Sequence, residues 1–190
     1  TENSGAIVNT GSEVGNGIYA LSLDGHLDIS NLPMSTKGAS YYLQEVKTLD
    51  GCVLDTAQYD AVFKQSDFTT KNYIKSFDVE NKTTDFEFNK TDVTGDKEVE
   101  GAQLTITDEN VVDQWTSDGK VHSIEGLVVG KTYTLSETVT AKDYVKATDI
   151  KFTVKNSSEL ETVTMKDKQV FVSKTTVGGE EVTGAHMQII

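Results

Sequence analysis

The chain has 190 residues and a formal net charge of −13, because 30 acidic residues outnumber 17 basic ones, all of them lysine. This length allows one large domain or two small ones, since a domain usually holds about 100–150 residues. A strongly negative chain without arginine is a poor partner for phosphate backbones, which excludes nucleic-acid binding, and no apolar run is long enough for membrane insertion. The single cysteine, Cys52, excludes an internal disulfide and a cysteine-cluster metal site.

Short runs of Val, Thr, Ile, Tyr and Phe alternate with Gly, Asp, Asn and Ser clusters along most of the chain, which is the pattern of an all-β protein. Only the stretch 60–76 is compatible with a helical turn. Turns are expected at 93–96, 117–120 and 156–159. Six or seven short strands within about 80 residues are typical of a small β-sandwich. The clearest strands are expected at 86–90, 102–107, 111–115, 131–137, 150–154 and 162–166.

Two parts of the sequence occur twice. The segment 86–106 aligns with 170–190, without a gap after the lysine, at an offset of 84 residues (174 − 90 = 84). The segment around Glu45 resembles the segment around Glu137, at an offset of 92 residues (137 − 45 = 92). Repeats of this kind indicate copies of one structural unit.

The repeats predict the domain organisation. We expect one complete domain at 86–168, the C-terminal portion of a similar domain, lacking its first strands, at 1–85, and the first strands of a further domain at 169–190. Read from tail to head, 187–190 followed by 1–8 resembles 104–112, so the two ends look like halves of one domain. Either the chain is one period of a longer array, or its last strands complete the first piece of a neighbouring copy, which predicts head-to-tail polymers.

The middle unit carries six motifs in a characteristic order, and together they resemble the CnaB-type, or SpaA-like, domains of Gram-positive surface adhesins and pilins. No single motif is specific, but the six cover the whole unit. The resemblance implies Ig-like or prealbumin-like β-sandwich domains in tandem. The motifs are Phe-Asn-Lys-Thr-Asp at 88–92, Gly-Ala-Gln-Leu at 101–104, Trp-Thr-Ser-Asp-Gly at 115–119, Gly-Lys-Thr-Tyr-Thr-Leu-Ser-Glu-Thr at 130–138, Ile-Lys-Phe-Thr-Val at 150–154 and Val-Thr-Met-Lys-Asp at 163–167.

In such domains a lysine on the first strand and an Asn or Asp on the last strand form an intramolecular isopeptide bond, assisted by a glutamate on a central strand. For the middle unit, the resemblance implies Lys90 as the nucleophile, Asp167 as the acceptor and Glu137 as the catalytic helper. An ordinary salt bridge among these groups is the alternative.

The same resemblance implies site residues in the two partial units. Glu45 would be a helper and Asn81 an acceptor in the first piece, while Lys174 would be the nucleophile of the trailing piece. The segment 1–85 contains no matching first strand, so its helper and acceptor have no such lysine within their own piece. A bond between Lys174 and Asn81 across two chains would supply one.

The chemistry of this trio follows from strand geometry. An amine attacks a carbonyl only when it is neutral, so the lysine must be desolvated. Side chains two residues apart share a face of a strand, so each of the three ionisable residues lies in line with two large apolar ones. A lysine with two carboxyls should keep one carboxyl protonated, and a protonated Glu137 could polarise the carbonyl of Asp167 and relay a proton to the leaving water.

The predicted function is structural. We expect a stalk segment of a bacterial cell-surface adhesin or pilus-like protein, extracellular and belonging to a wall-anchored parent, in which bond formation is a single turnover and not enzyme activity. Its partners would be neighbouring domains of an array or copies of itself, and a host or matrix ligand is possible. The alternative is a ligand-binding adhesin module. No cofactor and no metal are expected, because His26, His122 and His186 lie far apart and no metal-ligand spacing is present.

Overall fold

The structure is a computed structural model that describes residues 7–8, 11–15, 17–70, 73–186 and 188. The chain divides into two units, unit 1 at 1–82 and unit 2 at 83–190. Strands make up nearly all of the regular structure in both, which confirms the all-β class. Within the described ranges, no helix has the length and apolarity needed to cross a membrane.

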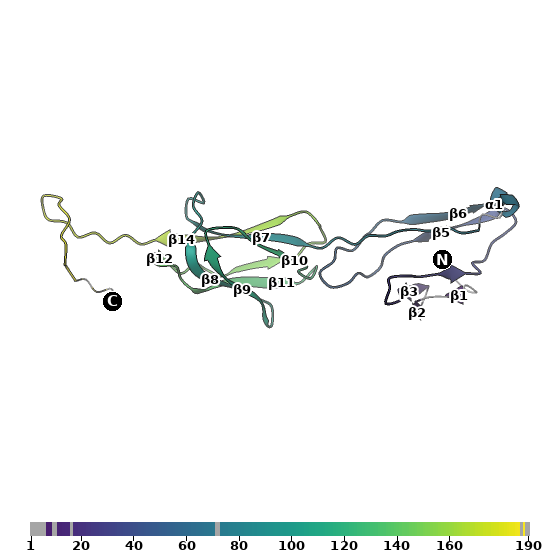
Figure 1. Cartoon of the computed structure of the whole chain (residues 1–190), viewed down its shortest axis with the longest axis horizontal. Helices are drawn as coiled ribbons and strands as arrows, with labels where there is room; N and C mark the ends of the chain where they lie inside the picture. Colours follow the sequence, from purple (N-terminus) through teal and green to yellow (C-terminus); the bar gives the residue numbers. More distant parts are fainter. Residues whose placement is uncertain (1–6, 9–10, 16, 71–72, 187, 189–190) are drawn as a thin grey trace. The chain divides into compact units, whose positions relative to one another are not determined.

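Unit 2 is a β-sandwich of two four-stranded sheets (Figure 1). One sheet has the strand order β10-β7-β14-β12 and the other the order β13-β11-β8-β9. The eight strands are β7 (Asp85–Asp92), β8 (Glu100–Thr107), β9 (Val111–Asp118), β10 (His122–Glu125), β11 (Thr132–Val139), β12 (Tyr144–Val145), β13 (Ile150–Thr153) and β14 (Glu161–Gln169).

The core of unit 2 lies between the two sheets, because alternate residues of each strand point inward. Phe88 of β7 shows how closely the layers fit: its ring lies 5.8 Å from that of Trp115 and 5.6 Å from that of Phe152, both on the facing sheet. Both sheets contribute to one cluster of buried residues, so the sandwich is closed around it. The cluster consists of Phe86, Phe88, Leu104, Ile106, Leu127, Tyr133, Leu135, Val154 and Met165.

All six strands expected in this region are present, with ends that differ by up to three residues. The sequence pattern missed β10 and β12. These strands have four and two residues, which is too short for the alternation of apolar and polar residues to stand out. The expected turns at 93–96 and 156–159 lie outside the strands, whereas β9 continues into the turn expected at 117–120.

The first and last strands of unit 2 are neighbours. β7 and β14 pair in parallel, with Lys90 opposite Met165 and Asp92 opposite Asp167. The chain enters this unit at the start of β7 and leaves it at the end of β14. Because the two strands run in the same direction, entry and exit lie at opposite ends of unit 2.

The described part of unit 1 contains three strand pairs and one helical turn, and β5 pairs with β6 in the longest of these ladders. The helix α1 falls within 60–76, the one stretch whose sequence is compatible with a helical turn. Phe63 is the only buried hydrophobic residue of the described part of this unit, so unit 1 has almost no core. Its elements are β1 (Ile7–Val8), β2 (Ser12–Gly15), β3 (Ile18–Ala20), β4 (Ile29–Ser30), β5 (Gly38–Leu43), β6 (Tyr59–Lys64) and α1 (Gln65–Thr70).

The segment that follows β14 forms no strand between 170 and 186, although it contains an isolated bridge from Thr175 to Glu181. The corresponding bridge of the middle unit joins Thr91 to Glu98. The offset is therefore 84 residues at the first position (175 − 91) and 83 at the second (181 − 98), so the gap-free alignment is wrong by one residue in this loop.

The assignment of the two flanking segments as portions of similar domains stays a prediction. The tail-to-head resemblance involves 187–190 and 1–8, most of which lies outside the described residues.

Candidate isopeptide site

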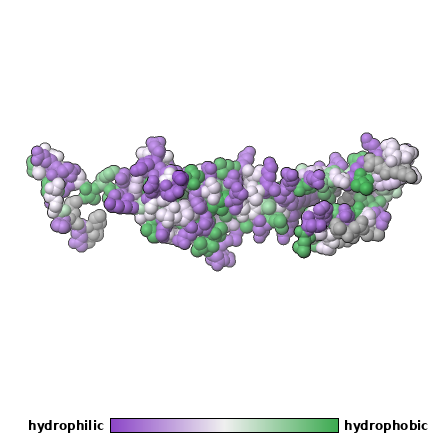
Figure 2. All heavy atoms as spheres, in the orientation of Figure 1, coloured by the Kyte–Doolittle hydropathy of each residue, from purple (hydrophilic) through white to green (hydrophobic). Residues whose placement is uncertain are grey.

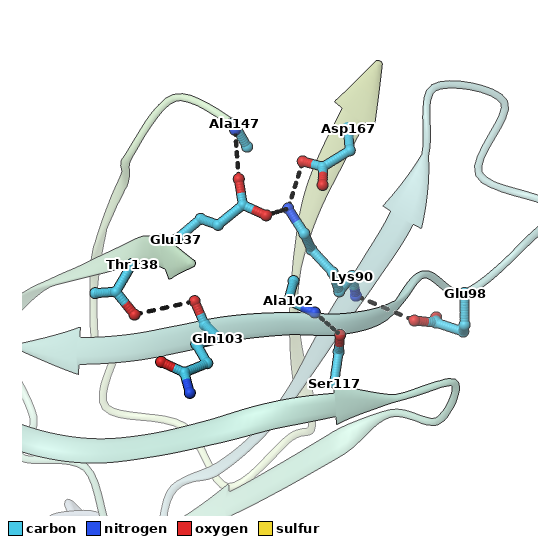
Figure 3. A network of polar contacts seen from close by, with 9 residues as sticks. All are labelled: Lys90, Glu98, Ala102, Gln103, Ser117, Glu137, Thr138, Ala147 and Asp167. Atoms are coloured by element: carbon cyan, nitrogen blue, oxygen red, sulfur yellow. Dashed lines mark hydrogen bonds and ion pairs between the residues drawn. The ribbon is translucent and has the colours of Figure 1, made fainter. Parts of the chain in front are cut away.

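Three ionisable side chains meet in the interior of unit 2, and they come from three different strands (Figure 3). Lys90 lies on β7 and Asp167 on β14, which are adjacent in one sheet, while Glu137 lies on β11 of the facing sheet. Each occupies an inward position of its strand, in line with apolar core residues. The exposed fraction is 2% for the lysine side chain and 0% for both carboxyls.

The ammonium group of Lys90 contacts both carboxyls. Its Nζ donates a short hydrogen bond to Oδ1 of Asp167 and lies 3.1 Å from Oε1 of Glu137. The other oxygen of Glu137, Oε2, accepts a hydrogen bond of 2.7 Å from the backbone N–H of Ala147. This backbone donor holds the glutamate in place and leaves Oε1 directed at the lysine.

Two buried oxygens of this cluster, Oε1 of Glu137 and Oδ2 of Asp167, have no hydrogen-bond partner among the described residues. Oε1 is within ion-pair distance of the ammonium group, but it is not aligned for a hydrogen bond. A buried acceptor without a partner is costly. A proton held by one of the two carboxyls would give these oxygens a donor.

The surroundings favour that proton on Asp167. Burial raises the pKa of Asp167, because the charged form is poorly solvated in the interior. The hydrogen bond and the positive charge of Lys90 act in the opposite direction, and the Glu137 carboxylate raises the pKa further. The net effect is a raised pKa, so Asp167 keeps its proton to a higher pH than an ordinary aspartate does.

This arrangement is suited to forming an amide. A lysine nitrogen in contact with a carboxyl group, in a site buried from solvent, has the nucleophile and the electrophile already in place. A second carboxylate beside the nitrogen can accept the proton that the amine must lose. The three residues predicted for the middle unit are thus brought together.

The backbone contacts around the trio could not be found from the sequence. The N–H of Lys90 donates to Oε2 of Glu98 at 3.1 Å, and its carbonyl accepts from the N–H of Val99 at 2.7 Å. Apart from the carboxylate of Glu98, these contacts are made by main-chain groups, as is the contact of the Ala147 N–H, and residue type gives no signal for a main-chain group.

Two of the residues predicted for the partial units also meet. The side-chain amide of Asn81 donates to Oε1 of Glu45 at 2.8 Å and to the hydroxyl of Thr48. Oε2 of Glu45 accepts from the backbone N–H of Asp55 at 2.8 Å. Lys174 is exposed and has no hydrogen bond or ion pair from its side chain within the described ranges. The same ranges contain no group of three His, Cys, Asp or Glu residues able to hold a metal ion.

Comparisons with known proteins agree with this fold. A family model described as a SpaA prealbumin-like fold domain matches residues 84–169. No curated protein matches the chain.

Three solved structures illustrate the likeness. The Bacillus anthracis TIE protein is 22% identical, with a TM-score of 0.47 over 80% of this chain and 28% of its own, so the chain spans less than a third of that protein. The shaft pilin SpaA from Lactobacillus rhamnosus GG is 15% identical over 82% of this chain and 77% of its own, with a TM-score of 0.40. Its C-terminal domain alone is 17% identical over 46% of this chain and 98% of its own, with a TM-score of 0.38. The match to the family model identifies residues 84–169 as a SpaA-like, CnaB-type domain with the prealbumin-like fold.

Proposed function

We propose that unit 2 is a self-crosslinking structural domain in which Lys90 and Asp167 form an isopeptide bond with the help of Glu137. The observation that carries this proposal is the burial of all three side chains in mutual contact. As an ion pair the cluster is expensive, because desolvation of buried charges often exceeds their attraction, and two of its oxygens have no donor. A neutral amide removes the positive charge and one carboxyl from the core.

The reaction balances without an external reagent. The carboxylate of Glu137 takes one proton from the ammonium group of Lys90, and the neutral amine attacks the carbon of the protonated carboxyl of Asp167. The tetrahedral intermediate then loses its hydroxyl group as water, with a second proton from the nitrogen relayed through Glu137. The ammonium, the carboxylate and the carboxylic acid become an amide, one water molecule and a neutral glutamic acid.

The bond would stabilise unit 2 and carry load. Lys90 and Asp167 are 77 residues apart, and a crosslink closing such a loop stabilises a fold by about 4.5 kcal/mol in the chain-entropy account. Tension applied where the chain enters and leaves this unit would run along β7, cross the amide and leave through the end of β14. The loops and strands between would be relieved of the force, and reducing conditions would not break the link.

These properties suit a stalk segment of a bacterial cell-surface adhesin or pilus-like protein, and the SpaA-like domain supports that placement. We infer an extracellular location on a wall-anchored parent, neighbouring domains or subunits as partners, and a single turnover in place of enzyme activity. Ligand binding is less well supported, because the aromatic rings of the sandwich, such as Phe88 and Tyr133, pack into its core.

Intact-mass spectrometry tests the proposal. Formation of the Lys90–Asp167 amide removes one water, so the chain should be about 18 Da lighter than its sequence requires. Digestion should yield one branched peptide joining the two residues. Lys90→Arg should restore the full mass, whereas Lys151→Arg, on an exposed position of β13, should leave the loss unchanged. A full mass in the unmodified chain would refute the proposal.

A further inference from the structure

We propose that the segment 141–147, which we call the strap, controls when the bond between Lys90 and Asp167 forms. Its end at Ala147 holds Glu137, and its strand β12 holds β14 just beyond Asp167, so the bond forms only when the strap is docked on unit 2. The inference rests on the proposed function, because it concerns the timing of that same reaction. It adds a conformational requirement that the three reacting residues do not supply.

One end of the strap holds the helper. Figure 3 shows the carboxylate of Glu137 between Lys90 on one side and the backbone of Ala147 on the other. Oε2 of Glu137 accepts a hydrogen bond of 2.7 Å from the N–H of Ala147, and Oε1 lies 3.1 Å from Nζ of Lys90. Because Glu137 is fully buried, loss of this N–H would leave Oε2 without a donor among the described residues. The position of the helper therefore depends on the strap.

The strand that carries Glu137 becomes irregular at this point. The register between β11 and β8 shifts between Glu137 and Val139, so Thr138 is an extra residue in β11. Its hydroxyl donates to the carbonyl of Gln103 at 3.2 Å, as Figure 3 shows. A bulge of this kind bends its strand and leaves one residue unpaired. The regular ladder therefore ends at Glu137, where the contact with the strap begins.

The other end of the strap holds the strand of the acceptor. β7 pairs with β14 up to Asp167, and that ladder goes no further. The next two residues of β14 pair with β12, and the N–H of Val170 donates to the carbonyl of Asp143 at 2.9 Å. Within the described ranges, the strap is thus the strand partner of β14 beyond the acceptor. The two pairs are Lys168 with Val145 and Gln169 with Tyr144.

The strap also packs against the support of the nucleophile. Ala141 is buried with Val99 and Ala102 in a small cluster of its own, and Tyr144 packs against that cluster. The N–H of Val99 donates to the carbonyl of Lys90 at 2.7 Å. The strap therefore contacts the supports of all three reacting residues, which lie on two facing sheets.

The strap is also the part of this site that opens most easily. β12 has two residues and lies at the edge of its sheet. Short segments with few backbone bonds open at a lower free energy than core strands do. Lys142, Asp143 and Lys146 are exposed, and Figure 2 shows mostly hydrophilic and neutral residues at the end of unit 2 where Figure 1 places β12. Opening the strap therefore costs less than separating the two sheets.

An open strap would stop the reaction without unfolding the sandwich. A displacement of about 1 Å between reacting groups can lower a rate about a hundredfold. With the strap open, Glu137 loses its backbone donor, and β14 loses its partner just beyond Asp167. The crosslink is therefore made only after the strap has docked, which prevents the bond from forming in a partly assembled sandwich.

The rate of crosslinking tests the inference. The full chain is synthesised in a cell-free reaction, and the loss of about 18 Da is followed by intact mass over time. Ala147→Pro lacks the N–H that holds Glu137 and should crosslink at least about tenfold more slowly than the unmodified chain. Ala147→Gly loses the methyl group but keeps the N–H, so it should crosslink at the unmodified rate.

Two variants of Tyr144 test the docking of the strap. Tyr144→Ala removes the ring that packs against the Ala141 cluster, so the strap should be docked for a smaller fraction of the time and the rate should fall in proportion. Tyr144→Phe keeps the ring and is the matched control, which should crosslink at the unmodified rate. This pair carries the test if Ala147→Pro does not fold. Equal rates in Tyr144→Ala and Tyr144→Phe would overturn the requirement for docking.

Hydrogen exchange tests whether the strap opens as one element. In Lys90→Met, which cannot crosslink, the N–H groups of Ala147 and Val170 should exchange with the same opening free energy, because both of their hydrogen bonds break when the strap opens. The amides in the ladder between β8 and β11 should exchange more slowly. Different opening free energies at Ala147 and Val170 would show two independent openings and would overturn the strap as a single element.

The proposed function and this inference fail separately. An unmodified chain that keeps its full mass would refute the bond itself. An unmodified chain that loses about 18 Da, together with equal rates in Ala147→Pro and Ala147→Gly, would retain the bond and overturn the role of the strap.

Discussion

Nζ of Lys90 and Oε1 of Glu137 are 3.1 Å apart although their strands belong to opposite sheets of unit 2. Asp167, in contrast, lies beside Lys90 in the same sheet. The helper thus approaches from across the core while the acceptor approaches along the sheet. In the proposed reaction, this separation would let Glu137 exchange protons with both Lys90 and Asp167 without occupying the position of either.

Replacing Glu137 with glutamine should leave a folded domain without the crosslink. The amide has nearly the shape of the carboxylate, but it cannot take the proton from Lys90. We expect the full calculated mass and, from the loss of about 4.5 kcal/mol, a melting temperature lower by about 20 °C or more in calorimetry. Glu87→Gln, on the outward side of β7, is the control and should retain both properties. A lighter mass in Glu137→Gln would show that another group moves the proton.

Replacing Asp167 with asparagine should change the leaving group and keep the bond. The carbon that Lys90 attacks is the same, but ammonia leaves in place of water. The variant should therefore be about 17 Da lighter than its own calculated mass, where the unmodified chain is about 18 Da lighter. High-resolution intact-mass measurement separates the two values, and Asp92→Asn, at the position of β7 paired with Asp167, should still lose water. A loss of water from Asp167→Asn would show that a carboxyl other than that of Asp167 is the acceptor.

The three residues of the buried site could be predicted because a strand alternates with a period of two. Lys90 follows Phe86 and Phe88 on one face of its strand, and the same alternation places Glu137 and Asp167 in the interior. The alternation and the family motifs therefore indicate the same three residues. Which carboxyl would carry a proton was not predictable. The interpretation from the sequence put it on Glu137, whereas burial and the neighbouring carboxylate raise the pKa of Asp167.

Other features of the fold could not be predicted from the sequence. β12 has two residues, and it leads into the segment whose Ala147 N–H holds Glu137. A strand of two residues is too short to show a periodic pattern, and a backbone N–H is present whatever the side chain is. Neither feature can therefore be recognised from the sequence. The one-residue difference between the loops after Lys90 and Lys174 was hidden because the glycines of the turn align in either register.

The raised pKa of Asp167 predicts an unusual pH dependence in a chain that cannot crosslink. In Lys90→Met the burial and the Glu137 charge that raise this pKa remain, while the opposing ammonium is gone. A group with a raised folded pKa contributes stability below its unfolded pKa, about 3.9, and loses it as the pH rises through the folded value. The free energy of unfolding in urea should therefore fall from pH 4 upward.

The double variant with Lys90→Met and Asp167→Asn supplies the comparison for that experiment. Asparagine does not titrate, so the difference in unfolding free energy between the two variants isolates Asp167. As the pH rises, the unfolding free energy of Lys90→Met should fall relative to that of the double variant. A difference that stays level from pH 3 to pH 7 would mean that the pKa of Asp167 is not raised.

Asp108 should titrate in the opposite direction, because it is ion-paired near the surface. A hydrogen bond from Lys131 and one of 2.8 Å from the backbone N–H of Asn110 lower the pKa of Asp108 to about 2. A lowered pKa stabilises the fold above the unfolded value, and this contribution is lost as the pH falls toward 2. Lys131→Ala should return the carboxyl toward its ordinary range, measured by NMR titration of its side-chain carbon. Lys120→Ala, another exposed lysine of unit 2, should leave that titration unchanged, and an unchanged curve in Lys131→Ala would show that Asn110 alone holds the carboxylate.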